Sequence, residues 1–80
     1  MQAKVYVRLK KGILDPQGKT VHHALSNLGF NGVTDVRIGK YMELSLESMP
    51  RDEAEKRVTA MCEKLLANTV IEDYRFEIED

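Results

Sequence analysis

The stretch Lys10-Lys-Gly-Ile-Leu-Asp-Pro-Gln-Gly18 decides the fold, because the hydrophobic period of the chain changes across it. Before it, apolar and polar residues alternate from Lys4 to Leu9, which is typical of a half-buried strand. After it, apolar residues recur at the spacing of one helix face: Val21, Ala24, Leu25 and Leu28. The stretch is therefore predicted to lead a strand into a helix.

The residues of this turn fit the start of a helix that runs from Pro16 to about Leu28. Asp15 is a good N-cap, and proline is well tolerated at the first helical position. One interpretation is a simple capped turn. The other is a docking loop in which the free N–H groups of Gln17 and Gly18 and the Gln17 amide contact a partner or an anion. The turn lacks the Lys-Ser/Thr pair of a phosphate-binding P-loop.

The segment from Val33 to Glu47 carries its apolar residues at even positions: Val36, Ile38, Met42, Leu44 and Leu46. A two-residue hairpin at Gly39-Lys40 would place the two apolar sets on opposite faces. The parity allows either an odd-length loop such as Gly39-Lys40-Tyr41 or one continuous strand bent at Gly39, and the continuous strand is favoured. Such a strand would span about 50 Å, whereas a compact domain of this length has a radius of gyration of about 12 Å. We therefore expect a second copy to cover the overhang, with these five apolar residues as candidate oligomer-interface residues.

The remainder of the chain predicts a second helix and a final strand. Ser48 is the expected cap of the helix, whose buried stripe is predicted to be Ala54, Val58, Met61 and Leu65, widened by Cys62 and Leu66. In the last strand, Tyr74, Phe76 and Ile78 are expected to face inward. The order predicts a single α+β domain over residues 1–80. It is β-α-β-α-β with one long central strand and ferredoxin-like halves, and dimerisation would complete its sheets.

Composition and motifs exclude several classes of function. The net charge of −1 argues against nucleic acid as a partner, and no apolar run approaches the length of a membrane span. Cys62 is the only cysteine, so no internal disulfide or thiolate metal cluster is expected. No catalytic motif is present, and we expect neither catalytic nor metal-ligating residues in this chain. A cytoplasmic protein is expected.

Four segments in order resemble the PurS family, the small subunit of phosphoribosylformylglycinamidine synthase. They are Leu9-Lys-Lys-Gly-Ile-Leu-Asp-Pro-Gln-Gly18, Ala24-Leu-Ser-Asn-Leu-Gly-Phe30, Val36-Arg-Ile-Gly-Lys-Tyr-Met-Glu-Leu44 and Cys62-Glu-Lys-Leu-Leu-Ala-Asn-Thr-Val-Ile-Glu-Asp-Tyr74. The resemblance covers nearly the whole chain. Thr69 departs from the pattern, since the family usually has proline after Ala-Asn.

The resemblance implies a non-catalytic bridging subunit of a glutamine-dependent ligase complex in purine biosynthesis. The implied partners are a large synthetase subunit, which uses ATP and Mg²⁺, and a glutaminase subunit that supplies ammonia. The chain itself would hold no cofactor and would form a homodimer or a tetramer. The partner-binding candidates are Asp15, Pro16, Gln17, Gly18, Arg37 and Lys40. The alternative is an ACT-like regulatory module, which would bind a small molecule at a helix N-terminus.

Overall fold

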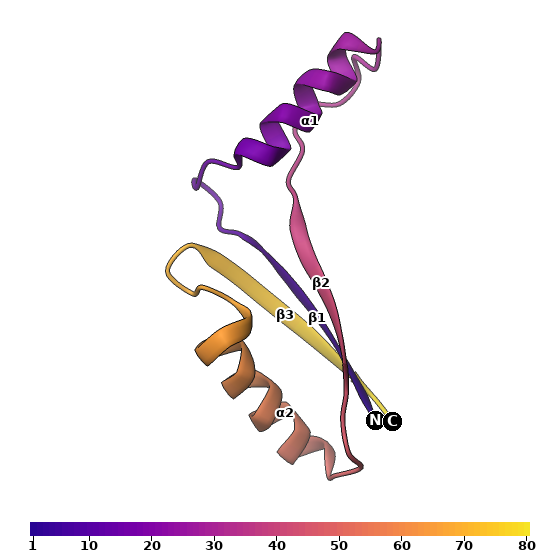
Figure 1. The fold of residues 1–80 in the computed structure, drawn as a ribbon, viewed down its shortest axis with the longest axis vertical. Coiled ribbons are helices and arrows are strands. Elements are labelled where there is room, and N and C mark those ends of the chain that lie inside the picture. The colour runs from indigo at the N-terminus through magenta and orange to yellow at the C-terminus, as the bar shows by residue number, and fades with distance from the viewer.

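The computed structural model describes every residue from Met1 to Asp80 and contains one three-stranded sheet with two helices (Figure 1). In chain order the elements are β1 (Gln2–Leu9), α1 (Pro16–Asn27), β2 (Gly39–Ser45), α2 (Arg51–Met61), the π-helical turn η1 (Cys62–Leu66) and β3 (Glu72–Glu79). The strand order is β2-β1-β3, and β1 is antiparallel to both neighbours. This arrangement confirms the α+β class and the predicted order of elements.

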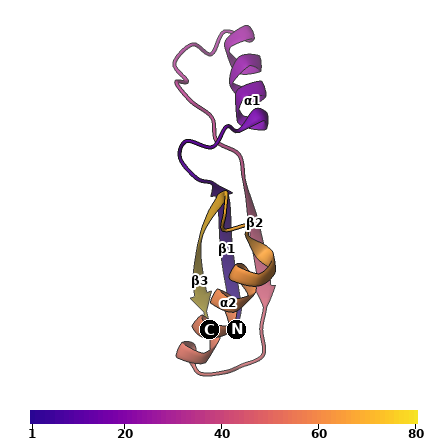
Figure 2. The same cartoon turned by 90° about the vertical axis from the view of Figure 1, so that its left-hand side faces the viewer.

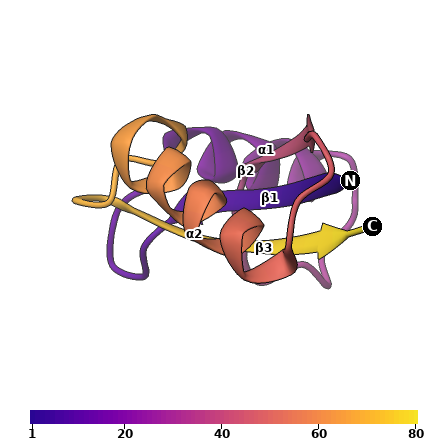
Figure 3. The same ribbon diagram turned by 90° about the horizontal axis from the view of Figure 1, so that it is seen from below.

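The sheet buries the face that its alternating residues predict. Ala3 and Val5 of β1 are fully buried, and Val7 is nearly so. α2 covers this face and runs alongside the strands (Figure 3). Because β2 and β3 both run antiparallel to the strand between them, β2-α2-β3 is a split β-α-β unit, one complete ferredoxin-like half.

The second helix differs from its predicted start and its predicted buried stripe. It begins at Arg51 after Pro50, and no side chain caps it, so the prediction of Ser48 as its cap was wrong. Its buried residues follow a strict four-residue spacing: Ala54, Val58 and Cys62 are fully buried and Leu66 is half-buried. Met61 and Leu65 are exposed, contrary to prediction. The wider turn of the π-helical segment η1 keeps residues that are four positions apart on the same side of the helix. At its end, the backbone N–H of Ala67 donates to the carbonyl oxygen of Cys62 at 3.0 Å.

The long central strand is shorter than predicted. β2 starts at Gly39 because its partner ends nearby, with Arg8 opposite Gly39, and residues 33–38 have no neighbouring strand to pair with. β1, not β2, occupies the middle of the sheet. The predicted parity is confirmed, since the five even-numbered apolar residues of 36–46 are half-buried and Arg37 and Glu43 on the other side are exposed. There is no hairpin at residues 39–41.

α1 stands apart from the rest of the molecule, beyond the end of the sheet (Figures 1 and 2). The chain is consequently elongated, with extents of 49 × 25 × 14 Å and a radius of gyration of 16.1 Å. A compact chain of this length would have a radius of gyration of about 12 Å. The apolar side of α1 therefore finds little of its own chain to pack against.

Candidate functional site

The turn between β1 and α1 is held by the carboxylate of Asp15. One carboxylate oxygen accepts the backbone N–H of Gly18 at 2.8 Å, which confirms Asp15 as the N-cap of α1. The other accepts the backbone N–H of Ile38 at 2.8 Å. These backbone donors, Gly18 first and then Ile38, hold the pKa of Asp15 below its ordinary value. Both oxygens thus bind internal groups, and Asp15 is only 6% exposed.

Gly18 has a packing role in the same turn. It is buried, and a Cβ atom added there would lie 2.2 Å from the carbonyl oxygen of Val36. Only glycine therefore lets the first turn of α1 approach the segment that leads into β2. The Gly18 N–H is already bonded to Asp15, so this helix N-terminus offers little to the small-molecule ligand that an ACT-like module would bind there.

Arg37 forms a second clamp on the turn. Its guanidinium donates to three carbonyl oxygens that close the end of β1: Leu9 O at 3.1 Å, Lys10 O at 2.9 Å and Ile13 O at 3.2 Å. These acceptors are neutral, and the nearest carboxylate with which the Arg37 charge interacts is that of Asp15, which is itself bonded to backbone N–H groups. Arg37 therefore combines a structural task with a charge that a partner or ligand can still sense.

The remaining partner-binding candidates lie on the surface. Pro16 and Gln17 are exposed at the start of α1. Lys40 is exposed on β2, and its Nζ lies 3.9 Å from a carboxylate oxygen of Glu72. The structure therefore divides the six candidates into two internal residues, Asp15 and Gly18, and four that a partner can reach.

The candidate interface residues of 36–46 occupy two environments. Met42, Leu44 and Leu46 pack against the chain's own core beneath α2. Val36 and Ile38 are half-buried in the unpaired segment between α1 and β2. An interface with another copy would therefore reach Val36 and Ile38 more readily than the other three residues.

The exposed apolar residues at the far end of the molecule form what we call the α1 surface: Leu14, Val21, Leu28 and Phe30. Leu28 is 73% exposed, Leu14 64% and Phe30 59%. Sequence periodicity correctly placed an apolar stripe on this helix, but the single chain leaves it largely uncovered. Burial by another protein surface is the favourable way to remove such groups from water.

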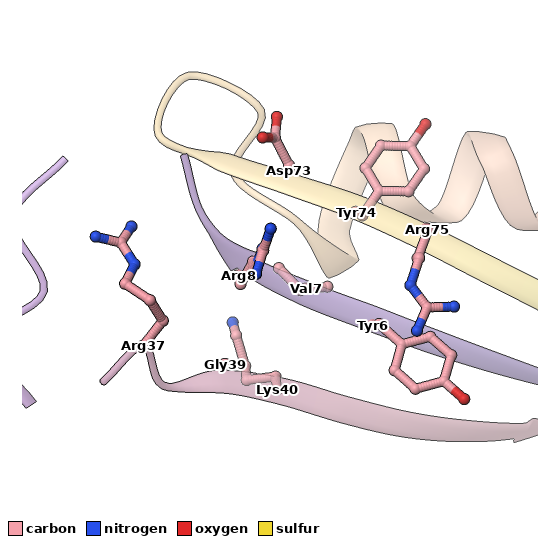
Figure 4. Close-up of a pocket in the computed structure, with 9 residues that line it drawn as sticks. All are labelled: Tyr6, Val7, Arg8, Arg37, Gly39, Lys40, Asp73, Tyr74 and Arg75. Atoms are coloured by element: carbon pink, nitrogen blue, oxygen red, sulfur yellow. The ribbon is translucent and has the colours of Figure 1, made fainter. Parts of the chain in front are cut away.

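A hollow of about 500 Å³ lies at the end of the sheet nearest to the β1–α1 turn (Figure 4). Its lining residues come from β1, β2, β3 and the segment before β2: Tyr6, Val7, Arg8, Arg37, Gly39, Lys40, Asp73, Tyr74 and Arg75. Among its charged residues, the sequence made Arg37 and Lys40 partner-binding candidates, and it placed Arg8 with Lys4, Lys10 and Lys11 on a basic strand face interpreted as solvated. That Arg8 lies beside Asp73 and Arg75 follows only from the strand register, which places Arg8 opposite Asp73 and Tyr6 opposite Arg75.

The structure shows contact surfaces and no assembled catalytic group. No three His, Cys, Asp or Glu side chains come together in a way that could hold a metal ion. Cys62 is fully buried, and burial raises the pKa of its thiol, as expected for a core residue. No helix has the length and apolar character needed to cross a membrane.

Comparison with known proteins gives the family. The model of the family described as PurS, phosphoribosylformylglycinamidine (FGAM) synthase, matches residues 2–80. The chain belongs to the PurS family. The chain is 61% identical over 79 residues to the phosphoribosylformylglycinamidine synthase subunit PurS of Bacillus subtilis (strain 168), with 99% of this chain and 93% of that protein covered.

Solved PurS structures have the same fold. A structure of Bacillus subtilis PurS matches with a TM-score of 0.89 at 61% identity and covers 99% of this chain and 98% of that one. PurS of Methanocaldococcus jannaschii, described as one of the subunits of formylglycinamide ribonucleotide amidotransferase in the purine biosynthetic pathway, matches with a TM-score of 0.88 at 42% identity. It covers 98% of this chain and 94% of its own.

A structure of PurLQS from Thermotoga maritima contains a chain that matches with a TM-score of 0.83 at 29% identity. The match covers 96% of both chains. In that protein the same fold is part of a larger assembly. The family resemblance stated from the sequence is thus confirmed, and so is the role of the family as a subunit of FGAM synthase.

Proposed function

We propose that this chain is the non-catalytic bridging subunit of a phosphoribosylformylglycinamidine synthase complex. It joins a glutaminase subunit to an ATP-dependent synthetase subunit and assists the passage of ammonia between them. The observation that carries this proposal is the uncovered α1 surface, on a fold that also occurs within the PurLQS assembly of Thermotoga maritima. ATP and Mg²⁺ would be bound and used by the synthetase subunit and not by this chain.

The α1 surface supports an assembling role on energetic grounds. Burying a leucine or phenylalanine side chain contributes about 1.5–3 kcal/mol relative to leaving it exposed. Leu28, Phe30 and Leu14 are each more than half exposed and lie at one end of an elongated molecule. A partner that docks on the α1 surface would therefore gain stabilisation there, and the rest of the chain extends away from this end as a spacer.

We further propose that the chain acts as a homodimer, with a tetramer built from two such dimers as the alternative assembly. Residues 33–38 approach the sheet as an unpaired extended segment, and β2 has a free edge in the single chain. Free strand edges and half-buried apolar residues such as Val36 and Ile38 favour pairing with another copy. The complex is proposed to work in the cytoplasm.

Co-purification from the cell of origin tests this proposal. A tagged version of the full 80-residue chain should retain both the synthetase and the glutaminase subunits through size-exclusion chromatography in the presence of glutamine and ATP. A tagged Leu28→Asp variant serves as the matched control, since it adds a charge at the α1 surface while leaving the sheet unchanged. Retention of neither subunit by the wild-type chain would contradict the proposal.

A further inference from the structure

The hollow at the end of the sheet gathers positive charge on a chain that is slightly acidic overall. Arg8, Arg37, Lys40 and Arg75 line it, with Asp73 as its one acidic residue. The whole chain has only 12 lysines and arginines and a net charge of −1. We propose that this hollow, called here the basic hollow, binds the phosphate group of a small phosphorylated molecule.

Arg8 is the cation of the basic hollow that its own neighbours leave unpaired. It makes no ion pair and no side-chain hydrogen bond, although the register places it opposite Asp73. Arg37 donates to three neutral carbonyl oxygens, and the Asp15 carboxylate lies close enough to interact with its charge. Arg8 therefore carries the positive charge that an external anion can meet most directly.

The other two cations differ in where they lie. The register places Lys40 opposite Val7, so its side chain lies on the α2-covered face of the sheet, away from Arg8 and Arg75, with Nζ 3.9 Å from Glu72. Arg75 bonds to the exposed Glu77 at 3.2 Å, and its guanidinium carbon lies 3.9 Å from the centre of the Tyr6 ring. The ring fixes the position of the Arg75 head group above the sheet, as Figure 4 shows. The exposed ion pair between Arg75 and Glu77 is weak, so a dianionic ligand can compete with Glu77 for the Arg75 guanidinium.

The strand register brings the arginines of the basic hollow within reach of one ligand. Arg75 is opposite Tyr6, and Arg8 is two residues farther along β1, so Arg8 and Arg75 are diagonal neighbours. Such neighbours have backbones about 7–8 Å apart, a distance that two long side chains can close around a single phosphate. On the other flank Gly39 lies opposite Arg8 and carries no side chain.

Gly39 is required on this flank because the backbone of β1 is too close for any other residue. A Cβ atom at position 39 would lie 2.4 Å from Val7 O and 3.1 Å from the Cβ of Arg8. No side chain from position 39 therefore covers Arg8. The volume of about 500 Å³ falls in the range of small-molecule sites.

The chemistry of the hollow favours phosphate over other anions. A phosphate monoester is close to a dianion at neutral pH and offers three acceptor oxygens, which suits several guanidinium donors at once. Asp73 has no ion-pair partner and can accept a hydrogen bond from a sugar hydroxyl. The hollow is too short for the extended basic track that a nucleic acid requires.

Phosphate titrations of the full-length chain test the proposal. Inorganic phosphate, ribose 5-phosphate and unphosphorylated ribose are added at constant ionic strength, and binding is followed by two-dimensional NMR of the backbone amides. Both phosphates should shift the amides of residues 6–8, 39–40 and 73–75, and ribose should not. If ribose 5-phosphate binds more tightly than inorganic phosphate, the sugar hydroxyls also contact the hollow. If the two bind equally, the hollow recognises the phosphate group alone.

Arg8→Gln is the decisive variant, because Arg8 is exposed and its loss leaves no buried partner. It should weaken the binding of both phosphates about tenfold or more. Arg57→Gln is the matched control. Arg57 pairs with Glu53 on α2, so this substitution removes the same charge far from the hollow. Equal weakening by the two variants, or no shift at the hollow with either phosphate, would overturn the proposal. Neither result bears on the bridging role, since the titration uses this chain alone.

Discussion

The carboxylate of Asp15 accepts the backbone N–H of Ile38 at 2.8 Å and so joins the start of α1 to the segment that enters β2. The two residues are 23 positions apart in the chain. Between these two residues the chain leaves the sheet, forms α1 and returns. Two further contacts hold this excursion: the hydrogen bonds of Arg37, and the contact between His22 Nε2 and Val33 O at 2.7 Å. The Asp15 carboxylate is therefore one of three contacts that set the position of the α1 surface.

Substitutions at Asp15 separate its two tasks. Asn is as good a helix cap as Asp, but its amide has only one acceptor oxygen, so it cannot accept the Gly18 and Ile38 N–H groups on separate oxygens as the carboxylate does. We expect Asp15→Asn to lower the melting temperature by about 5 °C and Asp15→Ala by about 10 °C. Thermal unfolding followed by circular dichroism measures both, with the exposed Asp35→Asn as control. An Asp15→Asn variant that melts with the wild type would show that Asp15 is only a cap.

The acid dependence of stability should report the same carboxylate. Backbone donors lower the pKa of Asp15 from its ordinary value of 3.8, so its stabilising contribution is complete above that value. The contribution is lost as the pH falls through the lower pKa of the folded state. The melting temperatures of wild type and Asp15→Asn should therefore differ at pH 6 and converge as the pH falls below 3.8. A difference that stays constant down to pH 2 would contradict this account.

Leu28→Asp should disrupt self-association or docking at the α1 surface. The side chain is 73% exposed in the single chain, so the charge does not disturb the chain's own core. If a second copy covers Leu28, the substitution should weaken association tenfold or more. Light scattering at micromolar concentration measures this, and Asn27→Asp adds the same charge to the neighbouring position as a control. A wild-type chain that remains monomeric would exclude a homodimer.

Gln17→Ala tests whether the start of α1 contacts a partner. Gln17 is exposed, makes no side-chain hydrogen bond within the chain and offers both a donor and an acceptor. We expect an unchanged melting temperature and about fivefold more chain needed to reach half-maximal glutamine-dependent activity of the reconstituted complex. Ser26→Ala, at the other end of α1, is the control. Superimposable titration curves for Gln17→Ala and wild type would leave this turn as a capped helix start.

The sequence predicted those features that local chemistry determines. The cap at Asp15, the inward residues of β3 and the even parity of 36–46 all follow from spacing and residue type, and the structure has each of them. The family resemblance then added the assembly, which no single residue of this chain indicates.

Features that depend on distant pairing were not predictable in this way. In the second helix, Ala54 and Val58 are buried as predicted, but Met61 and Leu65 are exposed. Burial continues through Cys62 and Leu66, which were expected only to widen the stripe, as the helix passes into the π-helical turn. The basic hollow depends on the register between β1 and β3, and on Gly39 where β2 meets β1. Nothing in the local pattern of α1 reveals that its apolar side would lack a cover within its own chain.

The bridging role is tested most directly by comparing two nitrogen sources in the reconstituted complex. Purified synthetase and glutaminase subunits are assayed for phosphoribosylformylglycinamidine formation with glutamine or with ammonium, before and after addition of this chain. If the chain only joins the two enzymes and assists ammonia transfer, its addition should strongly raise the glutamine-dependent rate and leave the ammonium-dependent rate nearly unchanged. A glutamine-dependent rate that is the same without the chain would contradict the account.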